Sequence, residues 1–192
     1  LNLMSQTLRY SKPQLVQIVL PTHRLYHDRC PKSLLELATI RRSEMNSNNP
    51  HLSAFGIYLS VMAFSNLIWE TLQVPLYTIW SEATAGEIIF AVVHCTVGDI
   101  LIAFASLSIS FILLSSGRWP NERFWTVAGF TLAGGIIYTA YSEWVNTQIK
   151  EAWTYSSSMP TLSTLEIGLS PLLQWAILPS ISFIVVKRRL RF

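Results

Sequence analysis

Four long apolar stretches without Lys or Arg dominate this chain of 192 residues. They cover roughly residues 52 to 73, 88 to 115, 124 to 143 and 165 to 186. A bilayer core of about 30 Å needs about 20 apolar residues per helix, so each stretch is long enough to cross it once. Only 13% of the residues are charged, which is about half the usual share in soluble domains. These features predict an all-α integral membrane protein built as a four-helix bundle.

Charged residues between the stretches predict the orientation of the bundle. The connection at 73–87 carries two Glu and no Lys or Arg, whereas the connection at 115–123 carries two Arg. Arg41 and Arg42 precede the first stretch, and four Lys or Arg residues follow the last. Since loops that stay in the cytoplasm carry the excess of Lys and Arg, both termini are expected inside. Six of the seven Trp residues also fall at the expected span boundaries, where indole rings prefer to lie.

The first fifty residues do not fit this plan. Residues 1–50 read as a polar N-terminal extension, and 51–192 as the four-helix transmembrane domain. One hypothesis is that Met45 is the true initiator, because the codons for residues 41–44 can be purine-rich like a ribosome-binding site. The alternative is a cytoplasmic arm that lies on the membrane surface, although its amphipathic pattern is weak.

Composition excludes some partners. The net charge is +3, but the basic residues flank apolar segments and form no stripe with interleaved aromatic residues, so we expect no nucleic acid partner. Cys30 lies in a polar stretch and Cys95 in an apolar one, so they form no disulfide framework. The expected partner is the lipid bilayer, together with an apolar lipid ligand, a membrane-protein partner or a second copy of the chain.

Four ionisable residues lie inside or at the ends of the spans, and each needs a reason to be there. An ionisable side chain in a span costs about 2.5 to 3.5 kcal/mol even on a lenient insertion scale. The four are Glu70, His94, Asp99 and Glu143. With both termini inside, Glu70, His94 and Glu143 fall in the outer half of the bundle, and Asp99 falls near its middle.

Helix periodicity groups these residues with other polar side chains. Asn66, Glu70 and Gln73 share one face of the first span, and Asp99 shares a face of the second with Cys95. We therefore expect a site that gathers Asn66, Glu70, His94, Glu143 and Asp99 under the loop at 153–155. Gly134 and Gly135 offer a surface for close helix contact.

Each of these residues also has a structural interpretation. Glu70 and Glu143 lie near span ends, where they are exposed to water if the boundaries shift by a few residues. His94 can serve as an interhelical hydrogen bonder, and Asp99 can bond to Tyr138 or to a serine. These alternatives stay open at the level of sequence.

The chemistry open to these residues is acid/base chemistry rather than metal chemistry. Within the four apolar stretches no Glu-x-x-His or His-x-x-x-His spacing places two metal ligands on one helix, so no metal site is expected and no cofactor is indicated. A carboxyl group in an apolar site beside a histidine suits general acid/base work, such as protonating and deprotonating a polyene or sterol double bond. The same groups can also relay protons between helices.

Several short strings resemble a group of small bacterial inner-membrane proteins without an assigned activity. The resemblance covers roughly residues 52 to 186 and implies a multi-pass protein of the bacterial inner membrane. It rests on Trp69-Glu70 to Pro75-Leu76-Tyr77, His94-Cys95-Thr96-x-Gly98-Asp99, Glu143-Trp144-x-Asn146 and Ser170-Pro171-Leu172-Leu173-Gln174-Trp175.

The segment from Glu143 to Pro171 is similar to the small membrane lycopene cyclases and related carotenoid enzymes. An acidic residue at a helix end is followed by Trp153-x-Tyr155 and by prolines that lead into the next span. In those enzymes an acidic residue follows Pro-Leu, whereas this chain has Leu173 and Gln174 there. The resemblance therefore implies a class of ligand, isoprenoid-type lipids, rather than the cyclase activity.

Three functions remain open from the sequence, and whether the chain is an enzyme is not decided. The first is a polar intramembrane site toward the outer leaflet that binds or transforms an isoprenoid-type lipid, with Glu70, His94, Asp99 and Glu143 as the candidate catalytic residues. The second is a non-catalytic subunit of a larger membrane complex. The third is a small proton or ion pathway.

Overall fold

The computed structural model describes residues 49–115, 117–162, 164 and 166–191. The N-terminal extension and the hypothesis about Met45 lie outside the described residues. Four long helices account for most of the described chain: α2 (Pro50–Gln73), α4 (Ala85–Leu114), α5 (Phe124–Trp144) and α6 (Leu169–Leu190). The expectation of a predominantly helical chain is confirmed.

Short elements connect the long helices at one end of the molecule. A 3₁₀ turn, η1 (Val74–Leu76), and the short helix α3 (Ile79–Glu82) lie between α2 and α4. A π-helical turn, η2 (Val145–Ile149), extends α5. Strands β1 (Thr161–Leu162) and β2 (Ile167–Gly168) then form an antiparallel pair before α6 begins.

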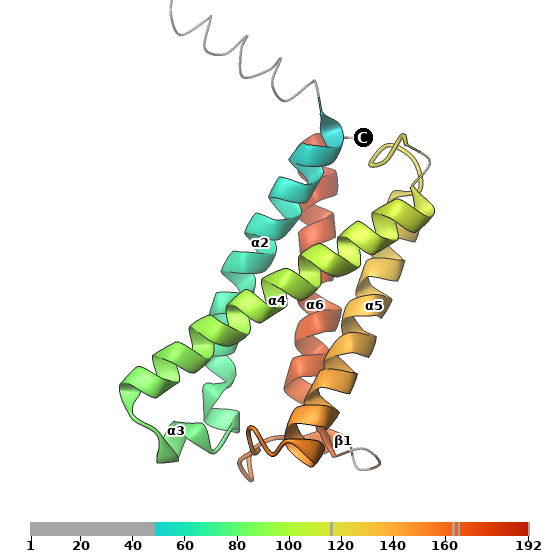
Figure 1. Ribbon diagram of the computed structural model, residues 1–192. Coiled ribbons are helices and arrows are strands. Elements are labelled where there is room, and N and C mark those ends of the chain that lie inside the picture. The colour runs from blue at the N-terminus through green and yellow to red at the C-terminus, as the bar shows by residue number, and fades with distance from the viewer. Residues whose placement is uncertain (1–48, 116, 163, 165, 192) are drawn as a thin grey trace, which may run out of the picture.

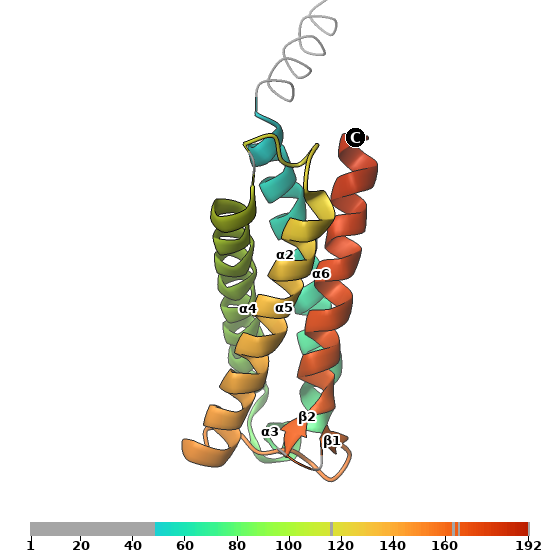
Figure 2. The same cartoon turned by 90° about the vertical axis from the view of Figure 1, so that its right-hand side faces the viewer.

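The long helices pack in a ring in which each has two main neighbours. Helix α2 packs against α4 and α6, and α5 packs against the same two helices. Figure 1 shows α4 crossing the others obliquely, and Figure 2 shows α5 and α6 side by side. The start of α2 and the end of α6 meet at one end, and α3 and the β-strands lie at the other (Figure 1).

Two of the four helices begin at places that the apolar pattern did not indicate. Helix α4 begins at Ala85, three residues earlier than expected, because Thr84 and Glu87 form a capping box. Helix α6 begins at Leu169 rather than at residue 165, because Ile167 and Gly168 pair with β1. It also continues four residues further, through a basic last turn that suits the negative end of the helix dipole.

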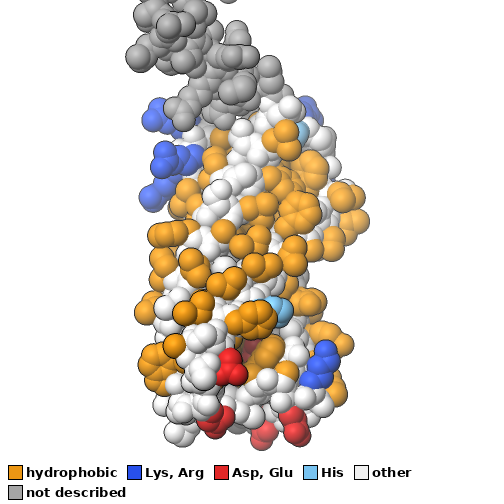
Figure 3. All heavy atoms as spheres, turned by 60° about the vertical axis from the view of Figure 1, so that its left-hand side comes forward, with side chains coloured by type: hydrophobic (Ala, Val, Ile, Leu, Met, Phe, Trp, Pro, Cys, Tyr) orange, Lys and Arg blue, Asp and Glu red, His pale blue; other side chains and the backbone are white. Residues whose placement is uncertain are grey.

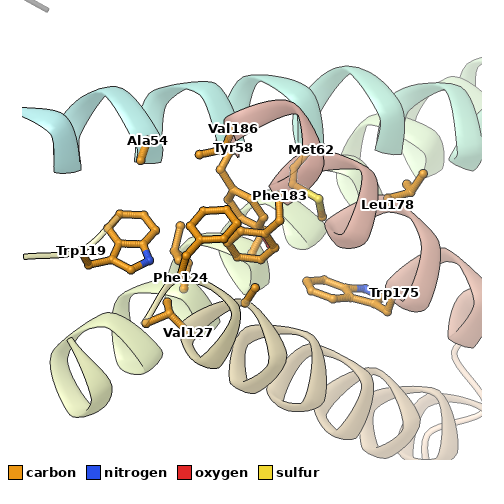
Figure 4. Close-up of a cluster of buried hydrophobic side chains, with 13 residues drawn as sticks. Ala54, Tyr58, Met62, Trp119, Phe124, Val127, Trp175, Leu178, Phe183 and Val186 are labelled. Carbon is orange, nitrogen blue, oxygen red and sulfur yellow. The ribbon is translucent and has the colours of Figure 1, made fainter. Parts of the chain in front are cut away.

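Aromatic side chains fill the half of the bundle nearest the end of α6. The ring centroids of Tyr58 and Phe183 lie 4.7 Å apart, and those of Phe124 and Phe183 lie 5.7 Å apart. Trp119, from the connection between α4 and α5, is also buried in this cluster. Figure 4 shows Trp175 of α6 at the far edge of the cluster. Beyond Trp175 the interior becomes polar.

Three of the long helices combine the length and apolar composition expected of membrane spans. They are Pro50–Leu76, where η1 continues α2, Ala85–Leu114 and Leu169–Leu190. Helix α5 is less apolar, because Thr, Ser, Gly and one Glu interrupt its sequence. A fourth span over α5 and the inward orientation of both termini therefore remain predictions.

Charged side chains are separated along the bundle axis. Basic residues gather at the end where α6 finishes, and acidic residues gather at the opposite end beside Lys150 (Figure 3). The basic end carries Arg118, Arg123, Lys187, Arg188, Arg189 and Arg191, and the acidic end carries Glu82, Glu87, Glu151 and Glu166. The basic end also holds one acid, Glu122, which forms an ion pair with Arg118 at 3.0 Å. An apolar surface lies between the two ends.

The two glycines of α5 allow close approach to different helices. A Cβ atom at Gly135 would lie 2.1 Å from the Trp175 ring, which is closer than two atoms can pack. A Cβ atom at Gly134 would lie 3.8 Å from Ser106 of α4, at an ordinary contact distance. Gly135 therefore lets the indole of Trp175 lie against the backbone of α5.

Candidate functional site

One buried face of α2 changes from apolar to polar along its length. Its buried residues recur at helical spacing, beginning with Ala54, Tyr58 and Met62 and continuing with Asn66, Glu70 and Gln73. Glu70 exposes only 7% of its surface. Because this face packs against α6 and α4, its last two turns bring polar side chains into the interior.

The amide of Gln174, on α6, lies at the centre of this polar region. Its Nε2 nitrogen is 2.8 Å from the Oδ1 of Asn66, 2.8 Å from an oxygen of Glu70 and 2.8 Å from an oxygen of Asp99. These three residues come from α2 and α4, so one buried side chain connects three helices. We call Asn66, Glu70, Asp99 and Gln174 the central polar cluster.

Glu70 and Asp99 form a pair of carboxyl groups within this cluster. Each has an oxygen 2.8 Å from the Gln174 nitrogen. Trp175 approaches the other oxygen of Asp99, with a nitrogen-to-oxygen distance of 3.3 Å.

Gln73 supports the pair from the end of α2. Its amide nitrogen donates to Glu70 at 2.8 Å, and its amide oxygen accepts from Ser170 at 2.9 Å and from Trp69 at 3.2 Å. Every polar atom of the Gln73 side chain is therefore used, and the Glu70 carboxyl group is held in position from two sides.

A second acidic centre lies where α5 ends. Tyr155, from the loop before β1, donates a hydrogen bond to Glu143. The Tyr155 oxygen in turn accepts a hydrogen bond from the backbone nitrogen of Gly168 at 3.0 Å. A Cβ atom at Gly168 would lie 3.0 Å from the Tyr155 ring, so a residue with no side chain suits this contact. Glu143 itself is 8% exposed.

The loop that carries Tyr155 is bound to the end of α2. Thr78 and Thr154 form a backbone hydrogen bond of 3.1 Å and a hydroxyl contact of 2.7 Å. The rings of Tyr77 and Tyr155 lie 5.5 Å apart between centroids. The loop therefore covers the polar end of the bundle, in agreement with the roof predicted at residues 153–155.

Both of these tyrosines are held in their neutral form. Burial, and then the negative charge of Glu143, raise the pKa of Tyr77. Burial and the hydrogen bond to Glu143 raise the pKa of Tyr155. Both hydroxyl groups therefore keep their protons at neutral pH, and that of Tyr155 donates to Glu143.

The structure brings together most, but not all, of the predicted site residues. Asn66, Glu70 and Asp99 contact the same amide, and Glu143 lies close enough to Glu70 for their charges to interact. His94 lies apart from them: its side chain is exposed on α4 and stacks on Phe90, with ring centroids 5.6 Å apart. The five-residue separation of His94 and Asp99 places them on different faces of α4.

Gln174 is the residue whose role the sequence did not indicate. It follows Leu173, the position where the cyclase-like pattern has an acidic residue. The sequence comparison therefore drew attention to the missing acid and not to the amide. A neutral amide in an apolar span also needs partners, because an unsatisfied buried polar group is costly. That signal alone marks Gln174 as a residue that must contact other polar groups.

The site has no built-in positive charge and no ready metal centre. Helices α2, α4 and α5 contain no Lys or Arg, and α6 carries its basic residues only in the last turn. Within the described residues, no group of three or more His, Cys, Asp or Glu side chains could hold a metal ion.

Comparison with known proteins identifies no relative, so the site is interpreted from its geometry alone. The chain matches no family model, no curated protein and no solved structure.

Proposed function

We propose that this chain is a four-span protein of the bacterial inner membrane that binds an apolar, isoprenoid-type lipid and performs acid/base chemistry on it. Three apolar helices of spanning length support the location. Helix α5 supports the fourth span, because its 21 residues extend about 31 Å at the usual helical rise. The separation of basic and acidic ends favours both termini in the cytoplasm.

In this orientation the acidic groups belong to the outer leaflet. Glu70 lies three residues before the end of α2, about 5 Å along the helix axis. Glu143 lies at the last turn of α5, under the loop that carries Tyr155. A lipid that enters between helices from the outer leaflet would bring its head to this level.

The observation that carries the proposal is the pair of carboxyl groups that share the Gln174 amide. Two carboxyl groups that share one amide in an apolar interior repel each other when both are charged, which favours a state in which one proton is present on the pair. A protonated carboxyl group can donate to a double bond, and its ionised neighbour can accept a proton from the product. The same pair also suits proton transfer between helices, which is the second function that this geometry favours.

Conservative substitutions test the proposal in a strain that lacks the gene. Glu70→Gln and Asp99→Asn keep the size of each side chain and remove its ability to exchange a proton. If the chain acts on a lipid, each variant should reach the membrane in normal amount but fail to restore the lipid and pigment profile of the parent strain. The matched control is Glu82→Gln, which changes an exposed acid at the same end of the molecule.

The same experiment separates the other functions. A proton pathway predicts an altered pH gradient across the membrane in these variants with no change in lipids. A subunit that acts only by packing predicts normal complementation by both variants and loss of association when Gly134 or Gly135 is enlarged. Complementation by both variants would exclude the acid/base function.

A further inference from the structure

The two acidic centres face a common part of the interior. Gly168 donates to Tyr155 at 3.0 Å, and Ser170, two residues later, donates at 2.9 Å to Gln73, which contacts Glu70. Tyr77, just beyond the end of α2, lies against Tyr155, with ring centroids 5.5 Å apart. The central polar cluster and the pair of Glu143 and Tyr155 therefore lie on two sides of one polar region.

An unpartnered hydroxyl group lies on the α5 side of this region. Thr139 is 7% exposed, and its Oγ1 has no hydrogen-bond partner among the described residues. Other helical threonines, such as Thr96 and Thr131, donate to the carbonyl four residues earlier. Thr139 makes no such hydrogen bond, so its buried hydroxyl group can still bond to a ligand in the interior.

Helix periodicity places this hydroxyl group between the two centres. The buried residues of α5 recur every fourth position, at Thr131, Gly135, Thr139 and Glu143. Gly135 is covered by Trp175, which approaches Asp99. Thr139 is one turn beyond that contact and one turn before Glu143, so it faces the region that the two acidic centres enclose.

The electrostatics of this region disfavour an anionic ligand. Its side chains supply carboxyl and hydroxyl groups, and the helices around it contribute no Lys or Arg at this level. The loops at this end carry Glu82, Glu151 and Glu166 beside Lys150. A phosphate group, which carries a charge of about −1.5 to −2 at neutral pH, would meet negative charge without a compensating cation.

From these observations we infer that the site takes a lipid whose head is uncharged and forms hydrogen bonds, such as a long-chain prenol, and that it rejects the corresponding phosphate. The inference rests on the proposed function and narrows its ligand class. The lipid hydroxyl would lie between Glu70 and Glu143 and would accept a hydrogen bond from Thr139. The apolar tail would leave between helices toward the bilayer.

Native mass spectrometry of the full chain in detergent tests this ligand class. The probes are a long-chain prenol and the monophosphate of the same prenol, added at equal concentration. The prenol should bind at least about tenfold more tightly than its phosphate. Thr139→Val, which keeps the side-chain shape and removes the hydroxyl, should weaken prenol binding by about three- to tenfold, the range expected for one neutral hydrogen bond.

Thr126→Val is the matched control, because Thr126 is exposed at the other end of α5. Equal or tighter binding of the phosphate would overturn the uncharged-head inference while leaving lipid binding intact. Equal prenol affinities for the Thr139 and Thr126 variants, at unchanged melting temperature, would overturn the role of Thr139. Binding of neither lipid would instead count against the proposed function itself.

Discussion

The amide nitrogen of Gln174 has two hydrogens and three oxygen atoms at 2.8 Å. An amide can therefore satisfy only two of Asn66, Glu70 and Asp99 at a time. The third oxygen needs another donor, and Glu70 has one in the Gln73 amide, at 2.8 Å. At the scale of single residues, three oxygens thus compete for one amide, and removing one of them changes the hydrogen bonds available to the other two.

Replacing Gln174 should destabilise the protein through the groups that it leaves unpaired. Gln174→Leu preserves most of the side-chain volume but removes the donor to three buried oxygens. We expect a loss of about 1 to 3 kcal/mol in the free energy of unfolding, the usual cost of an unsatisfied buried group. Thermal unfolding in detergent measures this loss, and Gln148→Leu, at an exposed position on η2, is the control. A melting temperature equal to that of the control would show that the amide does not bind the cluster together.

Tyr155 should make stability depend on pH in the alkaline range. Its pKa is raised above the usual value of 10.0 in the folded protein, so above about pH 10 the unfolded chain loses this proton first. The folded state then binds more protons than the unfolded state, and stability falls as the pH rises, by at most about 1.4 kcal/mol per pH unit for one group. Tyr155→Phe should unfold at a lower temperature at neutral pH, because it lacks the bond to Glu143, and should lose less stability between neutral and alkaline pH.

Tyr138→Phe provides the comparison for this pH profile, because Tyr138 is an exposed residue of α5. Its alkaline slope should match that of the parent protein. An unchanged slope in Tyr155→Phe would contradict the link between Tyr155 and alkaline unfolding.

At the scale of elements, α5 and α6 approach each other through one glycine and one tryptophan. The ring of Trp175 occupies the space where a Gly135 side chain would be. The same indole reaches Asp99 on α4. The packing of two helices and the geometry of the polar cluster therefore depend on the same side chain.

Adjacent glycines on α5 give a matched pair of substitutions. Gly135→Ala should destabilise the protein by about 1 to 3 kcal/mol, because the new methyl group forces Trp175 or a helix to move. Gly134→Ala has room beside Ser106 and should be neutral or stabilising by up to about 1 kcal/mol, since Ala favours a helix more than Gly. Thermal unfolding in detergent compares the two. Equal effects of the two substitutions would mean that the indole does not lie against α5 in the membrane.

The sequence predicted elements better than it predicted contacts. Apolar length and helical period located all four helices, and the spacing of Asn66 and Glu70 indicated their common face. The start of α6 was predicted about four residues too early, because strands of two residues are too short to show an alternating pattern in the sequence. The place of Gln174 was missed because the partner of a lone amide depends on how α6 is rotated against α2 and α4, which one helix sequence does not encode.

At the scale of the whole molecule, the separation of charge and the length of α5 predict a topology that can be tested. If α5 crosses the membrane with the other three helices, the connections at its two ends lie on opposite sides. If only the three more apolar helices cross, those connections lie on the same side, and the C-terminus lies opposite the start of α2. The basic residues after Lys187 favour the first arrangement, since they would face the cytoplasm.

Cysteine labelling distinguishes these topologies in the variant Cys30→Ser, Cys95→Ser. Single cysteines are introduced at exposed positions, with Asn121→Cys before α5 and Ser157→Cys after it. With four spans, a maleimide that cannot cross the membrane should label position 157 in intact spheroplasts and position 121 only after permeabilisation. Ser81→Cys, beyond α2, should behave like position 157 because both lie at the acidic end. Equal labelling of positions 121 and 157 would mean that α5 does not cross, and the site around Glu143 would then lie outside the bilayer.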